Sequence, residues 1–302
     1  KLVRLGDIAE IRRGFTTGAN DFFYLKPLDM TVKQVAEKAE TNPNALIKVQ
    51  NNAGWTGEIE AKYLKPFLFS LREIKNYVVK IEHLKRLVFD CNKQIKNTKC
   101  YEYIKWGESK QFNKRPSVRN RKNWFCLPSK EIPDFVSNRF LGERFGIPLN
   151  NQILVGDVFF IGNFLNNINK ITSFLLINST LSYLSIEIIA RTTYGIGVAY
   201  VYGPEINDLL LLNPKFYNSD IYLIFNNIFD DFKKRTILNI YSELGFDKYK
   251  PIREQEPNPL PDRKALDDIV FDAIGLTKDE RKEVYWSLAE LVKSRLDKAK
   301  SV

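Results

Sequence analysis

A stretch of basic residues with aromatic side chains between them offers the clearest chemistry in this sequence. From Lys105 to Lys122 the chain has seven Lys or Arg residues and a single acid, Glu108. Lys and Arg side chains that neutralise phosphates release condensed counterions, so a patch of this kind binds nucleic acid with a steep dependence on salt. Trp106 and Phe112 lie within the stretch, and aromatic rings can stack on exposed bases. The pattern indicates a polyanion-binding surface; the alternative is a solvated basic loop.

The charge of the whole chain favours the same interpretation, because it is unevenly distributed. The 302 residues carry a net charge of +10, with +12 in residues 1–150 and −2 in residues 151–302. Hydrophobic residues make up 44% and charged residues 27%, which is typical of a folded protein with one large domain or two of ordinary size. No apolar run reaches the roughly 18–20 residues needed to cross a bilayer, so no membrane partner is expected.

Motifs for catalysis or cofactor binding are not found. His83 is the only histidine, and Cys91, Cys100 and Cys126 form no Cys-x-x-Cys pair, so neither a His-rich centre nor a zinc ribbon is expected. Three cysteines in a chain of this length indicate free thiols in a cytoplasmic protein. No Gly-x-Gly-x-x-Gly or Walker A loop occurs, which disfavours a nucleotide site. We therefore expect no catalytic residue, metal or cofactor in this segment.

One match to a nuclease pattern keeps an enzymatic alternative open. Pro261-Asp262 followed by Glu280-Arg281-Lys282 has the letters of a metal-dependent Pro-Asp…Glu-x-Lys site. In the competing interpretation, Thr277 and Glu280 form the capping box at the start of a helix. The Glu-x-Lys spacing occurs elsewhere in the chain as well, so the pattern alone has little specificity.

The elements that must position the basic stretch change in character along the chain. Residues 22–25 are predicted to form a strand after a glycine-containing loop. Residues 92–106 are predicted to form a helix that leads into the basic stretch. Residues 171–190 are predicted to form a buried helix in one piece or two. Beyond residue 216 the apolar residues recur at helical spacing.

The opening of the chain is its most specific motif. Residues 2–25 read LVRLGDIAEIRRGFTTGANDFFYL. This segment strongly resembles the opening of target recognition domains in TaqI-type adenine-specific DNA methyltransferases, and more loosely that of type I specificity-subunit domains. The Gly-Phe-Thr-Thr-Gly-Ala-Asn-Asp-Phe-Phe core is the sharpest part. Residues 57–74, 114–128, 178–214 and 262–302 are similar to the same family in the same order, so the resemblance covers most of the chain.

The resemblance implies a division of labour within a longer enzyme. In this family an N-terminal catalytic domain binds S-adenosylmethionine and methylates a flipped adenine, using an Asn/Asp-Pro-Pro-Tyr/Phe pocket. This sequence has no Pro-Pro pair, so that pocket is expected to lie in a separate domain together with the cofactor. The expected partners are double-stranded DNA and the N-terminal methyltransferase domain of the same parent chain.

The predicted fold is α+β, with a mixed α/β target recognition domain over residues 1–215 and a helical C-terminal region over residues 216–302. Three segments are predicted to contact DNA. They are the loop around Gly14 and Gly18 with its flanking residues, called the glycine loop, the basic stretch, and a loop after the buried helix. The candidate residues are Arg12, Arg13, Thr16, Thr17 and Asn20 in the first, Lys114, Arg115, Arg119, Arg121 and Lys122 in the second, and Arg191, Thr192, Thr193 and Tyr194 in the third. In the competing interpretation, the hydroxyl and amide groups satisfy the turns internally.

The preferred interpretation is that this chain is the sequence-specific DNA-binding segment of an adenine-specific methyltransferase in a restriction–modification system. Type II restriction enzymes belong to such systems. The sequence establishes no activity for the segment alone. The two alternatives are a metal-dependent nuclease segment that uses Asp262 and Glu280, and a scaffold that recruits a partner subunit through its C-terminal helices, as in type I assemblies.

Overall fold

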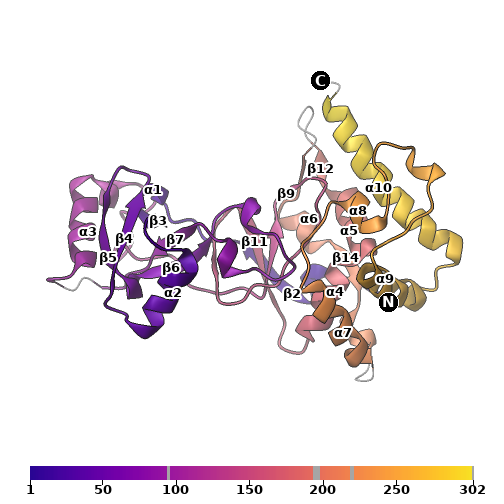
Figure 1. Cartoon of the computed structure of the whole chain (residues 1–302), viewed down its shortest axis with the longest axis horizontal. Coiled ribbons are helices and arrows are strands. Elements are labelled where there is room, and N and C mark those ends of the chain that lie inside the picture. The colour runs from indigo at the N-terminus through magenta and orange to yellow at the C-terminus, as the bar shows by residue number, and fades with distance from the viewer. Residues whose placement is uncertain (94–95, 193–197, 218–220, 301–302) are drawn as a thin grey trace.

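The computed structural model describes residues 1–93, 96–192, 198–217 and 221–300. They form two lobes joined by a narrower middle (Figure 1). One lobe is built around a six-stranded sheet, and the other is mainly helical. The N-terminus lies in the helical lobe, so the chain leaves that lobe, forms the sheet lobe and then returns (Figure 1).

The sheet lobe has the strand order β10-β6-β7-β3-β4-β5. Only β10 and β6 pair in parallel, with Leu154 opposite Phe67. The strands are β3 (Tyr24–Pro27), β4 (Leu46–Asn51), β5 (Thr56–Glu60), β6 (Leu64–Leu68), β7 (Arg86–Phe89) and β10 (Leu154–Val155). Exposed and buried residues alternate along β4, because successive side chains of a strand point to opposite faces of the sheet.

Among the described residues, the α-helices of this lobe are α1 (Asn20–Phe23), α2 (Val32–Thr41) and α3 (Lys99–Ser109). At the start of α3, the Thr98 hydroxyl oxygen accepts the backbone N–H of Tyr101 at 3.1 Å, which satisfies one of the free donors of a helix N-terminus. The Tyr103 ring of α3 stacks on Phe22 with centroids 4.6 Å apart. Its hydroxyl donates to the carbonyl oxygen of Phe22 at 2.5 Å. These contacts fix α3, and therefore the start of the basic stretch.

A three-stranded antiparallel sheet occupies the middle, in the order β2-β11-β8. Its strands are β2 (Ala9–Arg13), β11 (Phe159–Phe164) and β8 (Phe135–Asn138). A Cβ atom at Gly162 would lie 2.1 Å from the Phe135 ring, so the close packing of β11 on β8 requires glycine there. The end of β2 leads directly into the glycine loop.

The helical lobe contains two small sheets as well as its helices. β1 (Leu2–Arg4) pairs with β14 (Leu210–Leu212), and β13 (Ala199–Tyr200) lies between β12 (Arg191–Thr192) and β9 (Phe140–Leu141). The helices are α4 (Lys170–Ile177), α5 (Thr180–Ile189), α6 (Gly203–Asn207), α7 (Tyr222–Phe232), α8 (Ile240–Leu244), α9 (Pro261–Ile274) and α10 (Lys278–Lys300). The long α10 packs on α5, where Arg295 donates to Glu187 at 2.7 Å and both side chains are buried.

A buried polar network ties α9 to the rest of the helical lobe. The fully buried Arg263 donates from Nε to Glu243 at 2.9 Å, from Nη1 to the carbonyl oxygen of Asn178 at 3.0 Å, and from Nη2 to the hydroxyl of Tyr77 at 2.9 Å. Arg235 donates to the same Glu243 carboxylate at 2.7 and 2.8 Å. Burial alone would raise the pKa of Glu243, but the two guanidinium groups outweigh it and hold the pKa at about 2. Glu243 is therefore ionised at neutral pH.

The predicted α+β class is confirmed by these mixed elements. The buried helix predicted for residues 171–190 is present in two pieces, α4 and α5. The strand predicted for residues 22–25 starts later, because α1 extends to Phe23 before β3 begins at Tyr24. The helix predicted from residue 92 begins only at Lys99, where Thr98 supplies the cap.

Helices from both sides of residue 215 pack together in the helical lobe. α4 contacts α7 and α9, and α5 contacts α9 and α10. Helices from before and after residue 215 thus pack in the same lobe. The division into two domains at residue 215 stays a prediction.

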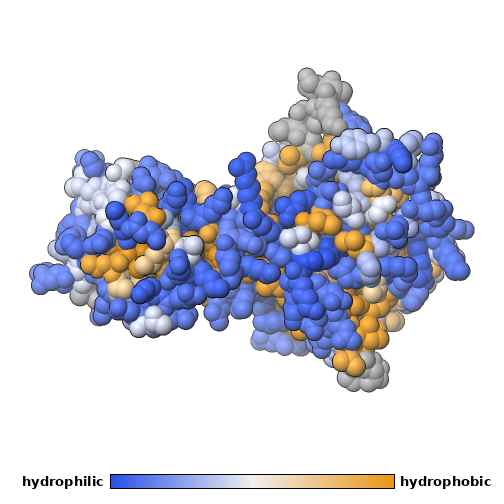
Figure 2. Space-filling view, in the orientation of Figure 1, coloured by the Kyte–Doolittle hydropathy of each residue, from blue (hydrophilic) through white to orange (hydrophobic). Residues whose placement is uncertain are grey.

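Hydrophilic residues cover most of the visible face of both lobes (Figure 2). Apolar residues gather along the lower edge of the helical lobe near α7, where Leu223 and Ile224 are exposed. No single helix of the described residues is long and apolar enough to cross a membrane; α4 and α5 together, bent by 59°, reach that length and composition.

Candidate nucleic-acid interface

The basic stretch begins in the last turns of α3 and continues over the surface of the sheet lobe. Lys105 lies in α3, Lys110 directly follows it, and Lys114 ends a short 3-10 helix, Phe112–Lys114. The other basic residues of the stretch lie in the irregular segment after that helix. Phe112, Val118 and Trp124 are buried in this region and anchor the segment. Trp124 is only 9% exposed and its ring lies 4.7 Å from that of Phe22, so it belongs to the core. The residues between these anchors remain at the surface.

The structure brings the glycine loop and the basic stretch together. The hydroxyl of Ser117 donates to the carbonyl oxygen of Gly18 at 2.7 Å. Arg115 pairs with Asp21 at 3.4 Å and lies over the Phe112 ring at 4.3 Å. Two segments almost one hundred residues apart, predicted separately to bind DNA, therefore form one continuous surface.

Gly18 is the point at which these two segments touch most closely. Its φ is +76°, a conformation that favours glycine, and an added Cβ would lie 2.8 Å from Ser117 Oγ and 2.9 Å from Ser117 Cβ. We expect Gly18→Ala to lower the free energy of unfolding by about 2 kcal/mol, roughly half from the left-handed backbone and half from the collision. Urea unfolding measures the loss.

Gly54→Ala is the matched control for this prediction. Gly54 has a similar φ of +84°, but an added Cβ would meet nothing within 4 Å. We expect it to cost only the backbone part, about 1 kcal/mol. Equal losses for both variants would contradict the proposed close contact between Gly18 and Ser117.

The remaining candidates of the glycine loop are largely engaged with neighbouring residues. Arg13 donates to the carbonyl oxygen of Asp157 at 2.9 Å and to its carboxylate at 3.2 Å, and the Thr16 hydroxyl donates to the same carboxylate at 3.0 Å. Arg12 pairs with Glu131. These arginines are half exposed, so each has donors that still face solvent.

Thr17 and Asn20 satisfy the turn internally, which was the competing interpretation. Thr17 is fully buried, and its hydroxyl donates to the Asn20 side chain at 2.5 Å and accepts the backbone N–H of Ala19 at 3.2 Å. The hydroxyl of Thr17 is therefore occupied by the loop itself. The structure gives it a role in shaping the loop, and the DNA contact stays a prediction.

The third predicted segment lies in the helical lobe, at β12. Arg191 donates to Glu205 of α6 at 2.6 Å and lies over the Tyr202 ring at 5.1 Å. No hydrogen bond or ion pair among the described residues joins it to the glycine loop or the basic stretch. Thr193 and Tyr194, and the side chain of Thr192, lie outside the described residues.

The charge of the basic stretch is only partly neutralised by the protein. Within the described ranges, Lys114, Arg119 and Lys122 are exposed and make no side-chain hydrogen bond or ion pair. Arg121 is half-buried and uses one N–H, donating to the carbonyl oxygen of Cys126 at 3.1 Å. Burial lowers the pKa of Arg121. Such a surface favours an anionic partner.

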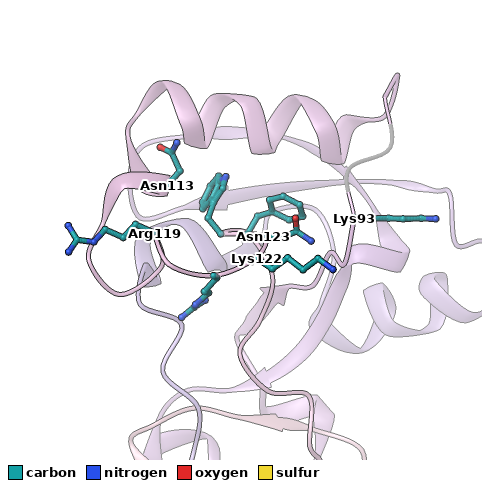
Figure 3. A pocket seen from close by; sticks show the side chains of 8 residues that line it. Lys93, Asn113, Arg119, Lys122 and Asn123 are labelled. Carbon is teal, nitrogen blue, oxygen red and sulfur yellow. The ribbon is translucent and has the colours of Figure 1, made fainter.

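A hollow of about 400 Å³ lies beside these cations, and it includes residues that the sequence did not single out (Figure 3). Lys93, Asn113 and Asn123 line it together with Arg119 and Lys122. Lys93 comes from the segment after β7, so only the folded chain places it here. Residues 93–99 contain three lysines, which was the available signal in the sequence.

Arg139 is a further residue that the sequence did not indicate. It lies over the rings of Phe140 and Phe160, each 5.8 Å from the guanidinium carbon, and donates to the carbonyl oxygen of Asp157 at 3.3 Å. The same carbonyl accepts from Arg13. Asp157 thus accepts hydrogen bonds from two arginines at the junction between the lobes.

The residues of the nuclease alternative serve the structure instead. Asp262 pairs with Arg235. Glu280 accepts both the backbone N–H and the hydroxyl of Thr277 at 2.8 Å, which is the predicted capping box. No group of three or more His, Cys, Asp or Glu side chains suited to a metal ion occurs in the part of the chain that the structure describes.

Comparison with known families identifies the class of protein to which this mixed α and β fold belongs. Residues 1–245 match the family described as the C-terminal domain of the type II methyltransferase M.Eco57I. This chain therefore belongs to that family of methyltransferase C-terminal domains. A search of curated proteins finds no match.

A solved structure shares the fold over nearly the whole chain. It is the type IIG restriction endonuclease BpuSI, with a TM-score of 0.58 and 12% sequence identity. The match covers 99% of this chain but only 31% of BpuSI. The chain thus corresponds in length to about a third of that enzyme, and the likeness extends through the helices beyond residue 245.

Proposed function

We propose that this chain is the DNA target recognition segment of an adenine-specific methyltransferase in a restriction–modification system. In this proposal it binds double-stranded DNA and positions it for methylation by a separate domain. That domain binds S-adenosylmethionine and belongs to the same parent chain, and the enzyme works in the cytoplasm.

The observation that supports this function best is the surface formed by the glycine loop and the basic stretch. Lys114, Arg119 and Lys122 present charges that the described residues do not neutralise. Phosphate contacts position a protein on the duplex, and side chains at base edges then supply specificity. Arg12 and Arg13 pair with Glu131 and Asp157 and are half exposed, and in this proposal they contribute to either task.

Separating recognition from chemistry also has a physical reason. Extruding a base from the duplex costs a few kcal/mol of stacking and pairing. A domain that binds phosphates and groove edges around the target can supply this free energy without touching the reacting atom. The family membership of residues 1–245 is consistent with such a role beside a methyltransferase domain.

The test is a fluorescence-anisotropy titration of the purified chain with a random-sequence duplex at several salt concentrations. We expect log Kd to rise with log salt concentration with a slope of roughly 3 or more, since each neutralised phosphate contributes about 0.9. Selection from a random DNA pool should then enrich one sequence. Methyl transfer to DNA by this chain alone, or binding that ignores salt, would contradict the proposal.

The two alternatives predict different outcomes in the same preparation. A nuclease segment would cut DNA with magnesium and lose this activity in Glu280→Gln. A subunit-binding scaffold would associate stably with a catalytic subunit and bind no DNA by itself. The capping role of Glu280 gives the first alternative no support from the geometry.

A further inference from the structure

Basic side chains line the hollow beside the basic stretch. Arg119 and Lys93 lie at opposite ends of the view, and Lys122 and Asn123 lie between them (Figure 3). The residues that line the hollow include four basic side chains, Lys93, Arg119, Arg121 and Lys122, and no Asp or Glu. An uncompensated row of cations matches a chain of anions better than a single one.

Hydrogen bonds join the two chain segments that form the sides of the hollow. The Asn123 side chain donates to the carbonyl oxygen of Asn92 at 3.3 Å. The Cys126 thiol donates to the carbonyl oxygen of Cys91 at 3.1 Å. These bonds join the segment before Lys93 to the segment after Lys122. They hold the two lysines on the same hollow, although the lysines are 29 positions apart in the sequence.

The aromatic residues of the hollow do not offer a stacking platform. Trp124 and Phe125 line it but are only 9% and 3% exposed. Base stacking by single-strand-binding proteins needs an open aromatic face. The four basic side chains of the hollow favour contacts with phosphates, which carry no sequence information.

We propose that this hollow tracks the backbone of one DNA strand over several consecutive phosphates, with Arg119, Lys122 and Lys93 contacting them in that order. The proposal rests on the DNA-binding function proposed above and extends it to Lys93, which lies outside the basic stretch. The track positions the duplex, while the arginines of the glycine loop remain available for base edges.

The test uses duplexes of the selected sequence in which one phosphate at a time is replaced by a neutral methylphosphonate. The intact chain should show a run of neighbouring positions on one strand at which the replacement weakens binding. Arg119→Ala, Lys122→Ala and Lys93→Ala should each weaken binding roughly three- to tenfold at low salt and reduce the salt slope by about 0.9. Each variant should be insensitive to a different position, in the order of the residues along the hollow.

Lys48→Ala is the matched control, because Lys48 is an exposed lysine of β4 in the same lobe and does not line the hollow. For this variant, methylphosphonate replacement should weaken binding at the same phosphate positions as for the intact chain. If the intact chain binds DNA while Lys93→Ala changes neither the affinity nor the phosphate positions that are sensitive to replacement, the proposed row of phosphate contacts is wrong and the DNA-binding function stands. If two variants lose sensitivity to the same phosphate, the proposed order is wrong. No binding by the intact chain would overturn both proposals.

Discussion

Arg263→Ala is expected to lower the free energy of unfolding by about 3–5 kcal/mol, the usual cost of removing one partner from a buried ion pair. Arg263 is fully buried and donates to Glu243, to the carbonyl oxygen of Asn178 and to the hydroxyl of Tyr77. The alanine variant leaves these acceptors buried with one donor fewer. Arg235 still donates to the Glu243 carboxylate in this variant, so the loss should lie within this range.

Urea unfolding followed by circular dichroism measures this loss. Lys264→Ala is the control, since Lys264 is the next residue of α9 and forms only an exposed pair with Asp268 at 2.5 Å. Exposed pairs of this kind contribute up to about 1 kcal/mol. A similar small loss for Arg263→Ala would show that the network does not join α9 to Asn178 and Tyr77 as the structure describes.

The combined variant Lys114→Ala, Arg119→Ala and Lys122→Ala should bind DNA roughly a hundredfold more weakly near physiological salt. Its salt slope should fall by about 2 to 3, because three phosphate contacts of about 0.9 each are lost. Stability should change by less than about 0.5 kcal/mol, since exposed residues without partners contribute little to folding. Anisotropy titrations of several unrelated duplexes should show the same loss for every sequence.

An equally charged control tests whether position or net charge is responsible. Lys26→Ala, Lys38→Ala and Lys48→Ala together remove three positive charges from the same lobe, and these lysines are exposed. This variant should lose at most a few-fold in affinity, because charges at a distance from the DNA are screened within about 10 Å at 0.1 M salt. Equal losses in both variants would indicate non-specific attraction by the lobe as a whole.

Much of the local structure follows from the sequence by itself. The spacing of apolar residues predicted the helices after residue 216, because a helix that buries one face must repeat apolar residues every three or four positions. Thr277 and Glu280 formed the expected capping box, since both bonds lie within one turn. The resemblance of residues 2–25 and of the later segments also predicted the family, and the uneven charge predicted a polyanion-binding surface.

The tertiary structure decided which of these residues face a partner. Thr17 has a side chain suited to phosphate, yet it lies buried in its own loop. Lys93 carries no motif, but hydrogen bonds between distant segments place it beside Lys122. Sequence spacing specifies contacts within a turn or along a strand. Long-range packing and ion pairs select among exposed charges, and only the folded chain reveals which cations, such as Arg119, remain free to bind an anion.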